Sequence, residues 1–187
     1  MGEKTIIETD RLIIRPFRIT DYPDCYQNYC SDPLTVRYLT WDVHPNPEFT
    51  KCFIQGKIEG YQKGLCLDWV VQLKADKTII GSIGAVSFLP KLHTCEIGYA
   101  YGSRFWHQGY GTEALKALIR FLFTEYKIDF ITAKYIKSNV FSGKVMKKAH
   151  MLVIGHEKNA LYNPNLNKRE DCIIRAIDLK SLKKYYL

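Results

Sequence analysis

Two hydrophobic patterns divide the chain into expected helices and strands. One apolar stripe recurs at helical spacing and predicts a helix over residues 112–126. Its members are Ala114, Leu115, Leu118, Ile119, Leu122 and Phe123. Residues 9–17 instead alternate β-branched or apolar residues with polar ones, and Pro16 stands near their end. They therefore predict a strand that stops at a turn.

The same patterns extend over the whole chain. We expect strands at residues 9–17, 68–74, 78–88, 95–101, 130–136, 151–155 and 171–179. We expect helices at residues 47–62, 112–126 and 140–150, and a first helix that begins at Thr20 and ends near Pro33. Thr20 is the expected hydroxyl cap, followed by Asp21 and Pro23 in the first turn. The predicted fold class is α/β, in the sense of an α+β mixed sheet covered by helices.

Composition limits the kind of protein. The chain has 187 residues, 47% hydrophobic and 25% charged, which predicts one folded domain over residues 1–187. Its most apolar runs are much shorter than the roughly 20 residues that a membrane-spanning helix needs. The first residues run into the opening strand without a signal-peptide pattern, so we expect a cytoplasmic protein that contacts no membrane.

The cysteine content and the net charge indicate less about the kind of protein than the length and composition do. The six cysteines form no CxxC pair and no Cys/His ligand spacing, so we expect mostly buried free thiols and no metal site. The formal net charge of +8 favours anionic partners in general, including ribosomal RNA. The lysines at 180, 183 and 184 are more typical of a solvated face than of a nucleic-acid site, so we expect no nucleic-acid partner except through the ribosome.

The strongest chemical signal is a glycine-containing turn between a strand and a helix. Gly109 and Gly111 stand where the strand at 95–101 leads into the helix at 112–126. Glycines let the main chain approach a ligand closely, and the first turn of a helix has unpaired N–H groups that attract anions. By itself the turn is equally compatible with a simple connection.

A dinucleotide-binding fingerprint is a more specific alternative interpretation of this turn, because Gly109-x-Gly111-x-x-Ala114 matches its glycine spacing. That fingerprint requires an acidic residue at the end of the following strand. The expected strand at 130–136 is followed by Lys137 and Ser138, and Asp129 lies before it. Repeated βαβ units are also missing, which argues against a dinucleotide-binding fold.

The order of motifs resembles the GNAT N-acetyltransferase superfamily, and in particular its ribosomal-protein-alanine N-acetyltransferase branch. The matching residues, in chain order, are Thr9, Arg11, Leu12, Arg15-Pro16, Gly81, Ile83, Gly84, Glu96-Ile97-Gly98-Tyr99, Phe105-Trp106, Gly109-Tyr110-Gly111-Thr112-Glu113-Ala114, Asn139 and Ser142. Two positions depart from the pattern. Trp106 replaces Gln or Arg, and His150-Met151 replaces Gly-Phe, although histidine tolerates a left-handed backbone better than most residues.

The resemblance implies acetyl-CoA as co-substrate, an amine as acceptor, and a set of site residues. The main chains of Tyr99 and Tyr101 would pair with the pantetheine arm. The residues that would hold the pyrophosphate are His107, Gln108, Gly109, Tyr110, Gly111 and Thr112. Asn139 would bind the pantetheine amides, although it also suits the cap of the next helix. Ser142 would lie near the sulfur.

The basicity of the amine determines how much help the acceptor needs from the enzyme. Only a neutral amine attacks a thioester, and neutralising an α-amine at pH 7 costs about 1 kcal/mol against roughly 4.6 kcal/mol for a lysine side chain. A protein N-terminal α-amine therefore needs only a weak base or a chain of water molecules to lose its proton. The expected acceptor is such an α-amine or a small amine, for example a polyamine or an aminoglycoside-like drug.

Glu96 is the candidate base, since a partly desolvated carboxylate can take the proton of the amine, although an exposed or salt-bridged strand residue is nearly as good an interpretation. Ser142 is the candidate partner of the leaving thiolate. Tyr38 and Trp41 are candidates for the substrate pocket, or else core aromatics. The alternatives are a non-catalytic acyl-CoA-binding sensor or scaffold and, more weakly, a ribosome- or RNA-binding protein. The oligomeric state is open, with a homodimer among the options.

Overall fold

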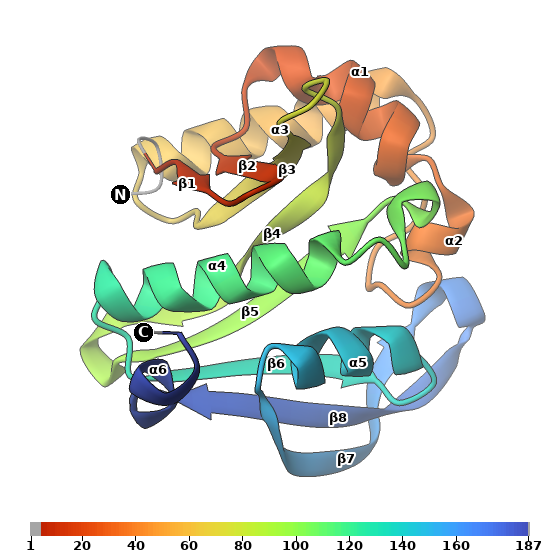
Figure 1. Ribbon diagram of the computed structural model, residues 1–187. Coiled ribbons are helices and arrows are strands. Elements are labelled where there is room, and N and C mark those ends of the chain that lie inside the picture. Colours follow the sequence, from red (N-terminus) through yellow and green to blue (C-terminus); the bar gives the residue numbers. More distant parts are fainter. Residues whose placement is uncertain (1–4, 187) are drawn as a thin grey trace.

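The computed structural model describes residues 5–186, apart from the side chain at position 183. Its eight strands form one sheet in the order β1-β2-β3-β4-β5-β6-β8-β7 (Figure 1). The strands are β1 Ile7–Glu8, β2 Leu12–Arg15, β3 Asp68–Leu73, β4 Ile79–Leu89, β5 Thr94–Tyr101, β6 Phe130–Ile136, β7 Leu152–Asn163 and β8 Lys168–Asp178. Within this described sheet β5 and β6 are parallel, and the other neighbouring strands are antiparallel. The expected mixed sheet is confirmed, and the dinucleotide-binding alternative is excluded because that fold needs a mostly parallel sheet.

Helices cover both faces of the sheet. They are α1 Tyr22–Cys25, α2 Pro33–Val36, α3 Pro47–Gln62, α4 Tyr110–Thr124, α5 Val140–Lys148 and α6 Leu179–Tyr185. α4, α5 and α6 lie on one face, and α1 and α3 lie on the other (Figure 1). We call these the α4 face and the α3 face.

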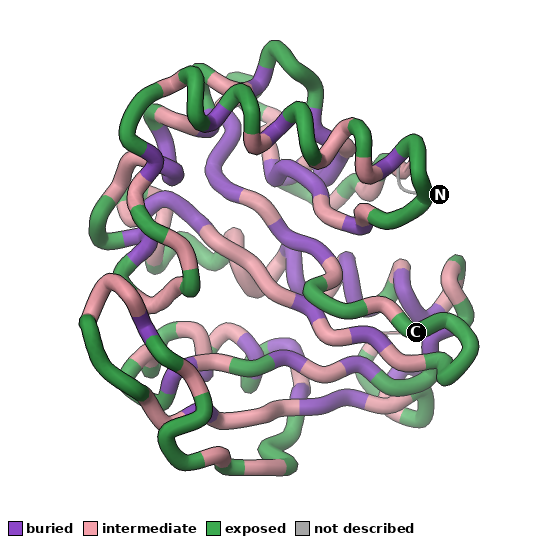
Figure 2. The backbone as a smooth tube through the Cα atoms, turned by 180° about the vertical axis from the view of Figure 1, so that it is seen from behind, coloured by how far each residue is buried: buried purple, intermediate pink, exposed green. Residues whose placement is uncertain are grey.

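Two hydrophobic clusters hold the layers together. On the α4 face, the predicted stripe of α4 is buried against the sheet, with every member at most 3% exposed. On the α3 face, Cys25, Tyr29 and Ile54 pack against Val70 and Ile79. The central strands therefore have buried residues on both sides. The backbone view shows these strands with many buried, purple stretches (Figure 2). Burying apolar area on both faces is the main stabilising contribution to such a layered sheet.

Several expected elements are confirmed. α3 and β6 have the predicted bounds, and α4 begins two residues before the expected start. His150 has a φ of 61°, so the histidine after α5 does adopt the left-handed conformation. Cys25, Cys30, Cys95 and Cys172 are buried free thiols, as expected, whereas Cys52 is exposed.

The first strand and first helix were predicted incorrectly in detail. The strand expected at residues 9–17 covers only β2, and β1 precedes it, because the N–H of Thr9 donates to Leu12 O and the N–H of Leu12 donates to Thr9 Oγ1, closing a local turn between the two. Thr20 does not cap the helix. Thr20 lies within a short 3-10 turn, Ile19–Asp21, and Asp21, the residue just before α1, accepts the N–H of Arg18 at 2.7 Å and a two-pronged ion pair from Arg15.

The carboxy-terminal third also differs from the prediction. β7 extends to Asn163 rather than residue 155, and β8 starts at Lys168 rather than residue 171. Most of β7 is exposed because it is the edge strand, so its sequence lacks the alternation that marks a half-buried strand. α6 was not predicted. Lys180 and Lys184 on it are exposed, as expected, and the side chain of Lys183 lies outside the described part.

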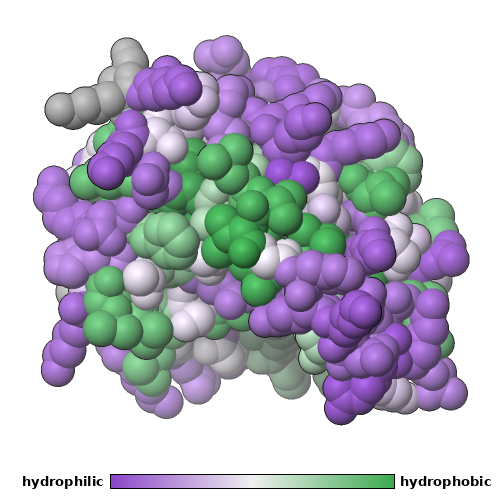
Figure 3. All heavy atoms as spheres, turned by 90° about the horizontal axis from the view of Figure 1, so that it is seen from below, coloured by the Kyte–Doolittle hydropathy of each residue, from purple (hydrophilic) through white to green (hydrophobic). Residues whose placement is uncertain are grey.

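The edge strand β7 exposes apolar side chains. Leu152, Val153 and Ile154 on β7 are 56–71% exposed. Seen from below, the side on which β7 lies, hydrophobic residues gather within a largely hydrophilic surface (Figure 3). Between residues 5 and 186, no helix is both long enough and apolar enough to cross a membrane. Residues 1–4, on which the expectation of no signal peptide depends, lie outside the described chain.

Candidate active site

The site forms where two parallel strands separate. β5 and β6 are paired only from Thr94 and Phe130 to Ile97 and Ala133. Beyond that point β5 pairs with β4 alone, and β6 pairs with β8 alone. A cavity of about 850 Å³ opens in this gap and is lined by residues from both faces of the sheet. The separation therefore joins the α4 face to the α3 face through the sheet.

The main chain of β5 presents unpaired groups to the gap. Gly102 N donates to Ile80 O, so these two residues form a hydrogen-bonded pair of the β4–β5 ladder. Antiparallel pairs alternate, which turns the N–H and C=O groups of Tyr101 and Tyr99 away from β4 and toward the gap. The carbonyl of Tyr101 is already engaged, because it accepts from Trp106 Nε1 at 2.7 Å and from Thr35 Oγ1 at 3.2 Å. Trp106, one of the two positions that depart from the family pattern, thus helps to shape the end of this edge.

The N-terminus of α4 provides a second group of free donors. Gly109 caps the helix with a φ of 87°, a conformation that glycine adopts without strain. Within the described chain, no hydrogen bond engages the main-chain N–H groups of residues 107–111. The N–H of Thr112 is bonded to Gly109 O, and Gln108 lies outside the cavity lining. The free donors and the positive end of the helix dipole suit a pyrophosphate.

Hydrogen bonds from the turn between β1 and β2 hold the N-terminus of α4 in place. Arg11 bonds Glu113 on α4 through Nε at 2.7 Å and donates from Nη1 to Gln108 O at 3.0 Å. Glu113 also accepts from Thr9 Oγ1 at 2.6 Å. Burial raises the pKa of Glu113, but the hydrogen bonds from Thr9 and Arg11 outweigh it and hold the pKa below its usual value. The sequence marked these residues by family resemblance and assigned them no role, because they lie about 100 positions apart.

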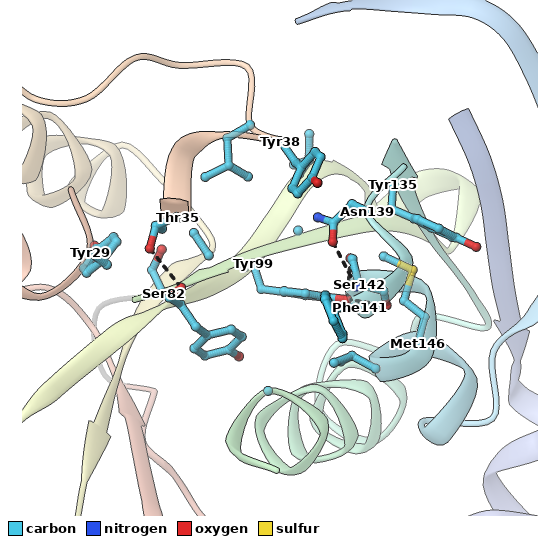
Figure 4. A pocket seen from close by; sticks show the side chains of 18 of the residues that line it. Tyr29, Thr35, Tyr38, Ser82, Tyr99, Tyr135, Asn139, Phe141, Ser142 and Met146 are labelled. Atoms are coloured by element: carbon cyan, nitrogen blue, oxygen red, sulfur yellow. Dashed lines mark hydrogen bonds between the residues drawn. The ribbon is translucent and has the colours of Figure 1, made fainter. Parts of the chain in front are cut away.

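Asn139 and Ser142 lie together at the start of α5 (Figure 4). Asn139 Oδ1 accepts the N–H of Ser142 at 3.2 Å, so the capping role expected of Asn139 is confirmed. Its amide nitrogen has no hydrogen-bond partner among the described residues. Ser142 Oγ lies 2.8 Å from the hydroxyl of Tyr99. That hydroxyl also lies 3.1 Å from Ser142 O, so its one proton can be donated either to that carbonyl or to Ser142 Oγ, and burial raises the pKa of Tyr99.

Glu96 lies on the opposite side of β5 from Tyr99. Its neighbours in alternation, Gly98 and Ala100, also face the cavity from the α3 face. Within the described chain the carboxylate of Glu96 has no hydrogen bond and no ion pair, so the salt-bridged interpretation does not apply. Lys134 on β6 is paired with Glu157 at 2.8 Å, and its pKa is raised chiefly by that pair and further by the charge of Glu96. The structure thus brings Glu96 and Ser142 to one cavity from two sides.

Tyr38 and Trp41 line the cavity from the segment that follows α2. The tip of the β7–β8 hairpin holds this segment in place. Asn165 donates from Nδ2 to the carbonyls of residues 36, 39 and 41 at 3.0–3.3 Å, and Asn163 donates to the carbonyl of residue 37 at 3.0 Å. We call this contact the asparagine clip. The sequence did not reveal it, because asparagines in a turn are also typical of local turn structure.

Metal ligation is not indicated by the geometry. Among residues 5–186, no group of three or more His, Cys, Asp or Glu side chains is arranged to hold a metal ion. Burial raises the pKa of Cys95 to about 12, which keeps this thiol protonated and a poor ligand.

Comparison with known proteins agrees with this site. The GNAT acetyltransferase domain matches residues 11–152. The chain is 30% identical over 160 residues to YnaD of Bacillus subtilis (strain 168), described as an uncharacterized N-acetyltransferase, covering 85% of this chain and 89% of the relative.

Two solved structures show the same fold. A GNAT-family acetyltransferase from Bacillus anthracis superposes with a TM-score of 0.82 at 26% identity, covering 93% of this chain and 98% of that chain. RimL, a ribosomal L7/L12 alpha-N-protein acetyltransferase in complex with coenzyme A, has a TM-score of 0.82 at 22% identity, covering 95% and 99%.

The family match covers most of the chain, and the match to YnaD agrees with it. The chain belongs to the GNAT acetyltransferase family. Within that family it is an acetyl-CoA-dependent N-acetyltransferase.

Proposed function

We propose that this enzyme binds acetyl-CoA along the gap between β5 and β6 and acetylates an amine that enters from the α3 face. One observation carries the proposal. The unpaired edge of β5 at Tyr99 and Tyr101 leads directly to the free N–H groups of residues 107–111. A strand edge suits the amides of a pantetheine arm, and N–H groups at a helix N-terminus suit its diphosphate.

Each site residue has a proposed part in the reaction. Main-chain donors of His107, Gly109, Tyr110 and Gly111, which line the cavity, hold the diphosphate. The free amide nitrogen of Asn139 donates to a pantetheine carbonyl. Glu96, directly or through water, accepts the proton that the amine loses. The hydroxyl of Ser142, held by Tyr99, donates a hydrogen bond to the sulfur as it leaves.

The proposed acceptor is a protein N-terminal α-amine, with a small amine as the alternative. An α-amine is neutral at low cost near pH 7, so a single carboxylate such as Glu96 suffices. The alpha-N-protein acetyltransferase RimL, which has the same fold, supports this choice. We further propose that the whole chain acts as one cytoplasmic domain and that a ribosomal protein is a candidate substrate. The apolar edge of β7 is where a homodimer contact would be sought.

The test compares two glycine variants. Gly109→Ala puts a side chain at a φ of 87° within the diphosphate site, whereas Gly64→Ala puts one at a φ of 69° in open space beyond the end of α3. Both introduce similar backbone strain, so Gly64→Ala controls for stability. We expect Gly109→Ala to release no free CoA thiol, or to do so only at a far higher acetyl-CoA concentration. Gly64→Ala should behave like the wild type.

Two outcomes contradict the proposal. Equal loss in both variants would mean that strain alone is responsible. Tight acetyl-CoA binding without turnover on any peptide or small amine would support the non-catalytic sensor instead.

A further inference from the structure

The acceptor half of the cavity has little negative charge. The acidic residues among the described cavity lining are Asp68 and Glu96. Asp68 is neutralised by Lys57 at 2.7 Å, and both side chains are largely buried. Only Glu96 remains unpaired on the α3 face of the cavity.

The carboxylates that pair with the lysines of the cavity are not available to a second cation. Lys57 and Lys134 both line the cavity, and each forms an ion pair, with Asp68 and Glu157 respectively. These pairs are neutral overall, so a second ammonium group entering the cavity would find no free carboxylate. Binding a charge without a partner in a partly enclosed site is costly.

The rest of the acceptor wall is apolar and aromatic. Tyr38, Leu39 and Trp41 come from the segment after α2, Phe53 comes from α3, and Leu161 comes from β7. His44 packs at 5.3 Å from Trp41 and 5.4 Å from Phe53, and burial lowers its pKa, which favours the neutral ring. The asparagine clip holds this wall in a defined shape.

We propose that the acceptor is an amine with one positive charge attached to an apolar or aromatic body, and that polycations such as polyamines and aminoglycosides are poor substrates. This inference rests on the proposed function. Glu96 meets the single ammonium group, and the Tyr38–Trp41–Phe53 wall contacts the apolar body. Both an N-terminal residue with an apolar side chain and a free aryl-alkyl monoamine present this chemistry.

The first experiment compares acceptors with the wild-type enzyme. 4-Phenylbutylamine and spermidine both present a primary alkylamine, so a difference between them does not arise from basicity. We expect kcat/KM for 4-phenylbutylamine to exceed that for spermidine by at least about tenfold. The tetrapeptide Phe-Ala-Gly-Gly is expected to exceed spermidine likewise, and the ratio of the tetrapeptide to 4-phenylbutylamine identifies a peptide or a small-molecule source.

The second experiment adds a second unpaired carboxylate to the acceptor side of the cavity. Val86 is the extra residue of a β-bulge opposite Glu96 and Ile97, lines the cavity and is 71% exposed, so it tolerates a polar side chain. Val86→Asp is expected to raise kcat/KM for spermidine by up to about fivefold while 4-phenylbutylamine gains less. Val86→Asn is the matched control, with the same shape and no charge, and should show no such gain.

The third experiment removes apolar contact. Trp41→Ala is expected to lower kcat/KM for 4-phenylbutylamine about tenfold and to leave propylamine, which lacks the aromatic body, nearly unchanged. Tyr38→Ala is a second variant in case the first is unstable, since Tyr38 contributes to neither hydrophobic core cluster.

The two proposals fail in different ways. If spermidine or kanamycin is acetylated as efficiently as the monoamines, or if Val86→Asp and Val86→Asn behave alike, the inference about acceptor charge is wrong although acetyl transfer is real. If no amine releases CoA thiol, the proposed function itself is wrong.

Discussion

Glu113 joins the turn between β1 and β2 to the N-terminus of α4, where we propose that acetyl-CoA binds. It receives hydrogen bonds from Thr9, from the main chain of Arg11 and from the Arg11 side chain. Its depressed pKa means that the ionised form stabilises the fold. This stabilisation is complete above the unfolded-state pKa of about 4.3 and is lost as the pH falls through the lower folded-state pKa.

We therefore expect Glu113→Gln to lower the free energy of unfolding by about 1–2 kcal/mol at pH 7. The difference from wild type should shrink to zero in acid, where both side chains are neutral. Urea unfolding at pH 7 and near pH 3 measures this. Glu8→Gln is the control, because the Glu8–Lys74 pair is solvent-exposed and should contribute almost nothing. An unchanged penalty at low pH would mean that shape, not charge, matters at Glu113.

A second prediction at the scale of single residues concerns Tyr99, which we treat as a positioning residue that acts through Ser142. Tyr99→Phe removes the hydroxyl that lies 2.8 Å from Ser142 Oγ and leaves the ring in place. We expect kcat to fall about tenfold with little change in the KM for acetyl-CoA. Steady-state kinetics of Tyr99→Phe, Ser142→Ala and the double variant provide the check. If the two effects add instead of overlapping, Tyr99 does not work through Ser142.

At the scale of elements, the asparagine clip joins the β7–β8 hairpin to the segment after α2. The carbonyls of residues 36, 37, 39 and 41 are all bonded by Asn163 or Asn165. A segment without regular secondary structure needs such partners to keep one conformation. The hairpin tip therefore determines where Tyr38 and Trp41 stand.

Replacing Asn165 tests this coupling. Asn165→Leu keeps the size of the side chain and removes both donors, so we expect the KM for the amine acceptor to rise about three- to tenfold while the KM for acetyl-CoA stays constant. Lys158→Ala, on an exposed part of the same hairpin, is the control. A parallel rise in both KM values would indicate a general loss of structure instead of a change at the acceptor wall.

On the scale of the whole molecule, one ligand is expected to connect both halves of the sheet. Acetyl-CoA in the gap would contact β5, α4 and α5, which belong to the main hydrophobic cluster. At a concentration 100 times Kd a ligand that binds only the folded state adds about 2.7 kcal/mol.

For a chain of this length, that stabilisation corresponds to a rise in Tm of about 5–11 °C. Differential scanning fluorimetry with acetyl-CoA measures the rise. Gly109→Ala should lose most of it and Gly64→Ala should keep it. Absence of any shift in the wild type at saturating acetyl-CoA would contradict the proposed site.

Local pattern predicted the elements that bury one regular face. α4 has a complete apolar stripe, and β6 is a short β-rich run between polar flanks, so both were found nearly to the residue. β7 was predicted too short and α6 was missed. An edge strand and a short terminal helix bury little, and their sequences therefore contain little periodic signal.

The sequence by itself determined the helices α3 and α4, the inner strands, the glycine turn at residues 109–111 and the family, because each depends on residues that are close together or on motifs in order. Only the tertiary structure decided that β5 and β6 separate after Ile97, that Glu96 and Ser142 reach one cavity from opposite faces, and that Asn165 holds the acceptor wall. These features arise from contacts between segments up to 129 positions apart. Such contacts are specified by how layers pack in three dimensions, and the periodicity of any single segment does not record them.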